Sequence, residues 1–349
     1  MTREARLAQK QVSRMPPPAP PASFRNPVGF TLDFDRLQAF EAGLNPDAPE
    51  RSAVPCRVLG YGEISTVFEI HAPGLEGLAF KRMSIFERPA EFERYFGAYE
   101  DYNQRIQAEA GLRLPAHGHA AFPNPAGRLI FYIIQQRLPR EAFGHHLLAA
   151  LPAPQRARFV QRLLRHCLAL WTFNGSQPAL RLGLDGQLSN WALAGLDPAA
   201  PDVDAADLLY LDTSTPFLRL EGREQLDPEL FLRTAPSFLA WVLRVFFLKD
   251  VLDRYYDFRR VVLDLVANLN KDGRAELVPE MIVTANAFFA DEAVALGAAP
   301  LTAAEVDAYY REDARIWSLF LSARYLDRFI RRRILRREYP YLLPGRIKR

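Results

Sequence analysis

Residues 59–67 read LGYGEISTV and join two short runs rich in Val, Ile and Phe, residues 56–60 and 65–71. Glycine lets a backbone approach a ligand closely and turn its N–H groups toward a phosphate. The segment connects strand to strand, whereas a dinucleotide-binding loop connects a strand to a helix. We therefore predict a glycine hairpin, which either contacts phosphate or uses its two glycines only to form the turn.

The residues around this hairpin predict a small antiparallel sheet. A third apolar run covers residues 78–83, residues 89–110 have helical periodicity with an aromatic stripe, and residues 129–138 resemble another strand. The chain is mainly helical after residue 139. Helices are predicted at 30–44, 154–173, 227–234, 236–250, 251–269, 275–295, 302–321 and 322–337. The sequence thus predicts an α+β fold, in which a small antiparallel sheet precedes a larger helical part.

Lys81 lies in the middle of the third apolar run, where burying an unpaired ammonium would be costly. It is either an edge lysine that points to solvent or a phosphate ligand held in a cleft. In the second case a carboxylate on the following helix would stabilise the charge. Glu100 lies on that helix and is the expected partner, with Glu93, one face away, as the alternative.

Two later segments combine acidic and amide side chains. Residues 182–191 read LGLDGQLSNW, and a tight loop there can bring Asp185 and Asn190 to one site, where the Asp accepts a hydroxyl proton and the Asn binds Mg²⁺. Residues 208–216 read LLYLDTSTP and place Asp212 at the end of an apolar strand, a position suited to a metal ligand. The alternatives are an ordinary Asp-Gly turn for the first segment and a cap or turn role for Asp212.

These signals follow one another in the order of the protein-kinase signature set. The chain therefore resembles the protein-kinase-like superfamily, and within it the bacterial branch of aminoglycoside phosphotransferases and choline kinases. Residues 131–139, FYIIQQRLP, look like the hinge of that branch. The resemblance covers about residues 54–220 and implies a bilobal fold with a small sheet-rich N-lobe and a larger helical C-lobe.

The resemblance implies ATP and Mg²⁺ as cofactors and transfer of the γ-phosphoryl group to a hydroxyl of a small molecule. Asp185 would be the catalytic base, Asn190 and Asp212 the Mg²⁺ ligands, and Lys81, oriented by Glu100, would hold the α- and β-phosphates. The nucleotide would also be contacted by two groups of residues: Gly60, Tyr61, Gly62, Ser65 and Val67 in the hairpin, and Gln135, Gln136 and Leu138 in the hinge. Phosphoryl transfer needs mainly such positioning and charge neutralisation. The alternative is a pseudokinase or nucleotide-binding scaffold that transfers no phosphoryl group.

Departures from the family's pattern favour that alternative. The third loop glycine is replaced by Ser65, the family's His two residues before the base by Gly183, and the aromatic residue after the strand-end Asp by Thr213. The stretch between the Asn and that Asp is long, which requires residues 194–207 to form a surface loop. These changes bear on activity more than on fold.

Composition sets the remaining expectations. The chain is 49% hydrophobic and 24% charged with a net charge of +3, as in a soluble globular protein. Residues 1–23 predict a disordered proline-rich tail, residues 24–138 the N-lobe with an N-terminal extension, and residues 139–349 the C-lobe. Two cysteines far apart and no recognisable secretory or membrane-spanning segment predict a cytoplasmic protein.

Basic residues gather at the end of the sequence, where residues 324–349 contain ten Arg or Lys. We expect a solvated helix face whose arginine stems cover apolar surface. The alternative is a site for an anionic partner: a lipid headgroup, a nucleic acid or a phosphorylated metabolite. The histidines at 117, 119, 145 and 146 have no Cys or carboxylate at ligand spacing and do not indicate a metal site.

Overall fold

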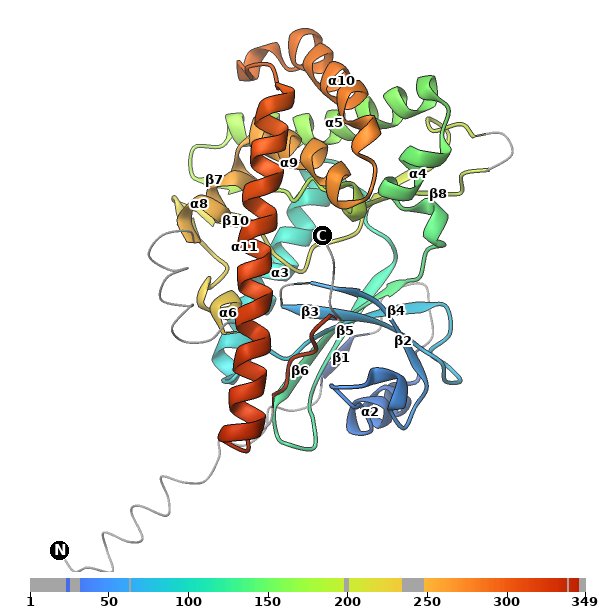
Figure 1. The fold of residues 1–349 in the computed structure, drawn as a ribbon, viewed down its shortest axis with the longest axis vertical. Helices are drawn as coiled ribbons and strands as arrows, with labels where there is room; N and C mark the ends of the chain where they lie inside the picture. The colour runs from blue at the N-terminus through green and yellow to red at the C-terminus, as the bar shows by residue number, and fades with distance from the viewer. Residues whose placement is uncertain are drawn as a thin grey trace, which may run out of the picture.

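The computed structural model describes residues 23–25, 32–62, 64–197, 201–233, 248–337 and 339–344. Two of the predictions, the tail at 1–23 and the helix at 236–250, fall largely outside these ranges. Figure 1 shows a sheet-rich N-lobe and a helical C-lobe, with the long helix α11 running along both. The predicted class, an α+β fold with a small antiparallel-sheet N-lobe and a larger helical C-lobe, is confirmed.

The N-lobe is built on a six-stranded antiparallel sheet with the order β1-β5-β6-β4-β3-β2. Its strands are β1 (Ser23–Arg25), β2 (Cys56–Tyr61), β3 (Ser65–Ile70), β4 (Leu78–Met83), β5 (His117–Pro123) and β6 (Leu129–Gln136). The predicted hairpin strands, the third strand and the hinge strand are all present. The sequence does not predict β5, because its residues HGHAAFP read locally as a loop. They form a strand by pairing with β6 along their whole length.

Helices cover the two faces of this sheet. Helix α3 (Pro89–Ala108) packs on one face and α2 (Phe34–Ala42) on the other. Side chains alternate between the faces along the central strand β6, because successive residues of a strand point to opposite sides. Phe131 and Ile133 pack in the cluster with α3, whereas Tyr132 packs in the cluster with α2.

The C-lobe consists of helices and two small sheets, β7-β10-β11 and β8-β9. The helices are α4 (Gly144–Ala150), α5 (Ala153–Ser176), α6 (Glu229–Leu232), α8 (Leu248–Asp253), α9 (Phe258–Lys271), α10 (Val278–Asp291) and α11 (Ala303–Phe329). The strands are β7 (Leu180–Leu182), β8 (Trp191–Ala194), β9 (Asp207–Tyr210), β10 (Leu218–Leu220) and β11 (Arg223–Glu224). Short 3₁₀ turns cover Pro49–Arg51, Arg140–Ala142, Leu188–Asn190, Arg254–Tyr256, Ala275–Leu277 and Val294–Leu296, and a π-helical turn covers Ile330–Ile334.

Two helix boundaries differ from the prediction for local reasons. The helix expected at 251–269 begins only at Phe258, because the side chain of Asp257 caps it by accepting the N–H of Arg260 at 2.9 Å. The helices expected at 302–321 and 322–337 form one continuous helix, α11, followed by the π-helical turn. No glycine or proline interrupts residues 303–337, so nothing in that stretch ends the helix.

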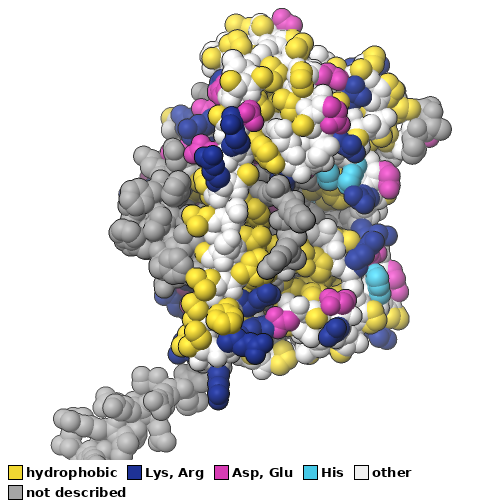
Figure 2. Space-filling model, viewed as in Figure 1, with side chains coloured by type: hydrophobic (Ala, Val, Ile, Leu, Met, Phe, Trp, Pro, Cys, Tyr) yellow, Lys and Arg dark blue, Asp and Glu magenta, His cyan; other side chains and the backbone are white. Residues whose placement is uncertain are grey.

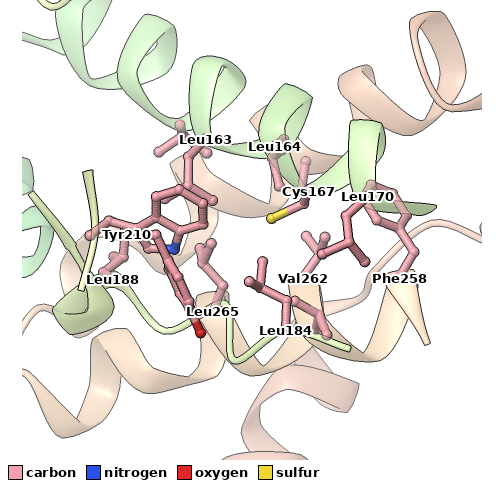
Figure 3. Packing of buried hydrophobic residues seen from close by; sticks show 14 of the residues in the cluster. Leu163, Leu164, Cys167, Leu170, Leu184, Leu188, Tyr210, Phe258, Val262 and Leu265 are labelled. Atoms are coloured by element: carbon pink, nitrogen blue, oxygen red, sulfur yellow. The ribbon is translucent and has the colours of Figure 1, made fainter. Parts of the chain in front are cut away.

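The core of the C-lobe encloses the loop that follows β7. Leu184 and Leu188 are completely buried between α5 and α9, where they pack in one cluster with Cys167 and Val262 (Figure 3). Asp185 lies between these two leucines in the sequence. The hydrophobic core therefore fixes the loop from both sides and leaves the carboxylate at the surface of the C-lobe that faces the N-lobe.

The C-terminal part of the chain returns to the N-lobe. Arg328 and Arg332 of α11 and the turn after it form ion pairs with Asp47. Residues 339–343 then pack in the two N-lobe clusters. The last described residues thus belong to the N-lobe core, although the sequence assigns them to the C-lobe. None of the helices in the described part of the chain has the length and apolar character of a membrane span.

Candidate functional site

Lys81 of β4 contacts Asp212, which follows β9 on the other side of the cleft. Its Nζ lies 2.5 Å from Oδ1 of Asp212 and donates to the Ser214 hydroxyl at 2.9 Å. The same Oδ1 accepts the backbone N–H of Ser214 at 3.0 Å and its hydroxyl at 2.7 Å. Burial opposes ionisation of Asp212, but Lys81 and Ser214 outweigh it and hold the pKa of Asp212 below its ordinary value. Lys81 is therefore a cleft lysine and does not point into solvent.

Glu100 does not pair with Lys81 as expected. Its side chain is exposed on α3, and the alternative, Glu93, is exposed as well. The face of α3 that contacts the cleft carries tyrosines: the hydroxyl of Tyr95 donates to the carbonyl of Ser214 at 2.7 Å. Glu100 directly follows Tyr99, and one residue along a helix turns the side chain by about 100° around the helix axis. Asp212 supplies the carboxylate for Lys81 in its place.

The same tyrosine stripe holds the loop that contains Asp185. The hydroxyl of Tyr102 donates to the carbonyl of Gly183 at 2.9 Å. Gly183 itself donates to the carbonyl of Phe217 at 2.8 Å, and a Cβ at this glycine would lie only 2.7 Å from the carbonyl oxygen of Tyr255. No larger side chain fits here. The position where the resemblance expects a His is thus braced by neighbouring tyrosines and backbone, a role that the sequence does not predict.

Asp185 is half-buried at the floor of the cleft, and its Oδ1 accepts the N–H of Gln187 at 3.1 Å. Burial and, next, the charge of Asp264 raise the pKa of Asp185 to about 7, although the Gln187 N–H opposes this shift. Asp264 is a buried residue of α9 whose Oδ1 accepts the hydroxyl of Tyr309 at 2.9 Å. A carboxyl group with this pKa can take up a proton near neutral pH.

Asn190 links the loop of Asp185 to the strand before Asp212. Its side-chain Nδ2 donates to the backbone carbonyl of Asp185 at 3.3 Å, and its backbone carbonyl accepts the N–H of Leu211 at 2.8 Å. Carboxylate and amide oxygens are the ligands that Mg²⁺ prefers, so Asp212 and Asn190 fit this ion. Over the described ranges, no group of three or more His, Cys, Asp or Glu forms a metal-binding cluster.

The glycine hairpin is a tight turn at the mouth of the cleft. The N–H of Gly62 donates to the carbonyl of Ser65 at 2.9 Å, and a Cβ at Gly62 would lie 2.9 Å from the Ser65 hydroxyl. Gly60 pairs with Val67 across the hairpin and has no atom within 4 Å of the place a Cβ would take, while Tyr61 is 37% exposed. Gly62 thus uses its N–H to close the turn, and Gly60 leaves open space beside the strand.

A side chain connects β6 to Leu211, the residue that follows β9. Nε2 of Gln135 donates to the carbonyl of Leu211 at 3.0 Å, and the N–H of Gln136 donates to the carbonyl of Ala116 at 3.0 Å. Leu138 is half-buried after the strand. The roles of Gln135, Gln136 and Leu138 beside an adenine remain predictions.

A pocket of about 210 Å³ occupies the cleft. It is lined from four sides: by Gly62, Ile64 and Ser65 of the hairpin, by Asp185, Asp212, Ser214 and Thr215, by Phe217, Leu232, Val251, Leu252, Arg254 and Tyr255, and by Asp313, Ile316, Trp317 and Phe320 of α11. Figure 2 shows apolar side chains gathered between the lobes alongside α11. The sequence predicts a helix here but contains no motif that marks it as part of the site. The only signal in the sequence is the three- and four-residue spacing of the lining residues.

The C-terminal arginines take two kinds of position. Arg331 pairs with Asp327 one turn away at 2.9 Å, and Arg332 pairs with Asp47. Arg333, Arg336 and Arg337 are exposed. Part of the basic segment therefore ties α11 to the N-lobe and part of it is a solvated surface. An anionic partner for that surface remains a prediction.

Comparisons with known proteins give one family match and several structural likenesses. The profile of a family described as "Family of unknown function (DUF6206)" matches residues 47–328. No curated protein matches the sequence. Among solved structures, the chain is similar to WaaP in complex with acyl carrier protein (15% identity, 77% of this chain and 98% of that chain, TM-score 0.32). It is also similar to a Stt7 homolog from Micromonas algae soaked with ATP (15%, 83% and 87%, TM-score 0.38) and to a GDP complex of an aminoglycoside 2'-phosphotransferase-IIIa variant (10%, 69% and 94%, TM-score 0.31).

Proposed function

This chain belongs to the DUF6206 family, whose function is unknown, and we propose that it is an ATP- and Mg²⁺-dependent phosphotransferase that acts on a hydroxyl of a small molecule. One observation carries the proposal: Asp185 and Asp212 line one pocket, Lys81 contacts Asp212, and Asn190 contacts the loop of Asp185. Lys81 and Asp212 are 131 positions apart and in direct contact, and Asn190 connects the loops of the two aspartates. Structural support alone does not require such a set of polar groups beside an open pocket.

Each of these residues has a distinct role in the proposed reaction. Lys81 binds the phosphates of the nucleotide, and Asp212 and Asn190 hold Mg²⁺, which when bound neutralises charge on the transferred group. Asp185 accepts the proton of the acceptor hydroxyl, for which a pKa of about 7 is well suited. The hairpin residues Gly60, Tyr61, Gly62, Ser65 and Val67 lie beside the phosphates, and the hinge residues Gln135, Gln136 and Leu138 beside the base.

The second candidate function is a nucleotide-binding scaffold without phosphoryl transfer. It is favoured by the contact of Lys81 with Asp212, because this lysine has no carboxylate partner on α3 that would keep it free for phosphate. The hydrogen bonds that hold the Asp185 loop argue against this function. In that loop the N–H groups of Leu184 and Gly183 donate to backbone carbonyls at 2.9 and 2.8 Å. The two functions share nucleotide binding and differ in turnover.

The first test is the thermal stability of the protein with and without Mg-ATP. A ligand at 100 times its dissociation constant adds about 2.7 kcal/mol, which raises the melting temperature of a protein of this size by a few degrees. We expect this shift in the wild type and in Asp207→Ala, an exposed residue of β9, the strand that precedes Asp212, and its loss in Asp212→Ala. A shift that survives in Asp212→Ala would overturn the metal-site assignment.

Turnover separates the two candidate functions. Wild-type protein that forms ADP and a phosphorylated acceptor in the presence of Mg-ATP is a phosphotransferase, and Asp185→Asn should lower this turnover by about 10²–10⁴-fold while keeping the thermal shift. A Mg-ATP shift without ADP formation across a panel of alcohols, sugars and amino alcohols would favour the scaffold.

A further inference from the structure

One wall of the cleft pocket is a single stripe of α11. Asp313, Ile316, Trp317 and Phe320 line it at the spacing i, i+3, i+4 and i+7, which places them on one face of the helix. The neighbouring Leu319 is 56% exposed and lies on another face. Three of the four residues that α11 presents to the pocket are apolar.

The pocket surface next to this stripe is also apolar. Phe217, Leu232 and Leu252 are buried residues that line it from the C-lobe. Phe217 stacks on Tyr255, with ring centroids 4.2 Å apart and an angle of 26° between the rings. A partly aromatic surface thus adjoins the space beside Asp185.

The two charged residues of this wall, Arg254 and Asp313, contact each other. Arg254 approaches Oδ1 of Asp313 at 3.4 Å and donates to the hydroxyls of Tyr309 at 3.0 Å and Tyr255 at 2.9 Å. The remaining charged residues among the described lining are Asp185 and Asp212, which belong to the proposed phosphoryl-transfer site. A polycationic or polyhydroxylated acceptor needs a polar partner for each group that it buries. The wall formed by α11 offers mainly surface for an apolar group.

We propose that the acceptor is an alcohol whose hydroxyl is attached to an apolar ring or chain, and that α11 binds this apolar part. The inference rests on the proposed function, because it places the hydroxyl beside the proposed base. In the reaction, the alcohol oxygen forms a bond to the γ-phosphorus of ATP and the bond from that phosphorus to the β,γ-bridging oxygen breaks. ADP leaves, and the hydroxyl proton goes to Asp185.

The test compares acceptor classes with Mg-ATP present throughout. 2-Phenylethanol and 1-octanol represent apolar alcohols, and glucose and kanamycin represent polyhydroxylated and polycationic acceptors. We expect the apolar alcohols to increase ADP formation and to yield a phosphorylated product that mass spectrometry detects. ADP formation that responds only to glucose or kanamycin would overturn the inference and leave the proposed function intact.

Two substitutions in α11 localise the effect. Phe320→Gln changes a pocket residue, and Leu319→Gln makes a similar change at the adjacent exposed position. Loss of an apolar contact in a pocket costs about tenfold or more in specificity. We therefore expect kcat/KM for 2-phenylethanol to fall about tenfold or more in Phe320→Gln only, with the Mg-ATP thermal shift unchanged in both variants. Equal effects of the two substitutions would contradict a pocket role for α11.

A binding measurement keeps the inference separate from the proposed function. If no acceptor increases ADP formation, binding of 2-phenylethanol is measured directly by ligand-observed NMR. Binding that Phe320→Gln removes and Leu319→Gln retains would support the apolar subsite even though the proposed function fails. Absence of binding to the wild type would overturn the inference. Ile316→Thr, which keeps the β-branched shape but introduces a hydroxyl in the same stripe, replaces Phe320→Gln if that variant does not fold.

Discussion

Replacing Glu41 by Gln tests whether a buried ion pair holds the N-lobe sheet against α2. Arg82 donates to Glu41 through Nε and a terminal nitrogen, both at 2.7 Å, and the hydroxyl of Tyr132 donates to the same carboxylate at 2.5 Å. The side chains of Arg82 and Glu41 are only 4% and 2% exposed. Removing one charge therefore leaves the other buried without its counterion.

The expected magnitude follows from this burial. Breaking a buried ion pair by changing one partner costs about 3–5 kcal/mol. The entropy of unfolding scales with chain length, so for a chain of 349 residues each kcal/mol lowers the melting temperature by about 1.5 °C. Glu41→Gln should therefore melt roughly 4–8 °C below the wild type in a calorimetric or fluorescence scan.

A matched triple variant identifies the cause. Glu41→Leu, Arg82→Met and Tyr132→Phe together remove every polar atom of the cluster, and such a replacement is often neutral or stabilising. We expect the triple variant to melt close to the wild type and to keep the Mg-ATP shift, because Arg82 and Lys81 point to opposite faces of β4. A triple variant as unstable as Glu41→Gln would refute the reasoning and assign the stability to the shape of these side chains.

Three further predictions concern the site and its supports. Asp185→Asn should lower turnover by about 10²–10⁴-fold while the Mg-ATP thermal shift stays as in the wild type, which steady-state kinetics and melting scans will measure. The pKa of Glu91 is held at about 2, chiefly by its hydrogen bond with Arg233, so this carboxylate stabilises the fold by about 3 kcal/mol above pH 4.5 and loses that contribution as the pH falls toward 2. Urea unfolding at pH 7 and pH 3 should show this loss in the wild type and a smaller one in Glu91→Gln; equal losses would contradict the shift. Gly183→Ala places a methyl group 2.7 Å from a backbone carbonyl oxygen and should destabilise by about 1–3 kcal/mol, whereas Gly97→Ala, a helical position with nothing within 4 Å, should stabilise by about 0.5–1 kcal/mol.

Much of the site could be predicted from the sequence because its residues sit in short patterns with local causes. The glycines at 60 and 62 mark a strand–turn–strand junction, and Lys81 stands out as a charge within an apolar strand. Asp185 and Asp212 follow apolar segments at positions where a chain emerges from its core. The order of these patterns along the chain carries the resemblance to the protein-kinase-like superfamily, and that resemblance implies the bilobal fold.

The tertiary structure alone decided which of these residues meet and what surrounds them. Lys81 contacts Asp212 rather than Glu100, because the face of α3 that lies toward the cleft carries tyrosines. Strand β5 exists through its pairing with β6, and α11 forms a pocket wall through its packing against both lobes. Periodicity tells which face of an element is apolar, but not which other element covers it. That choice depends on contacts between residues far apart in the chain, which local sequence patterns do not record.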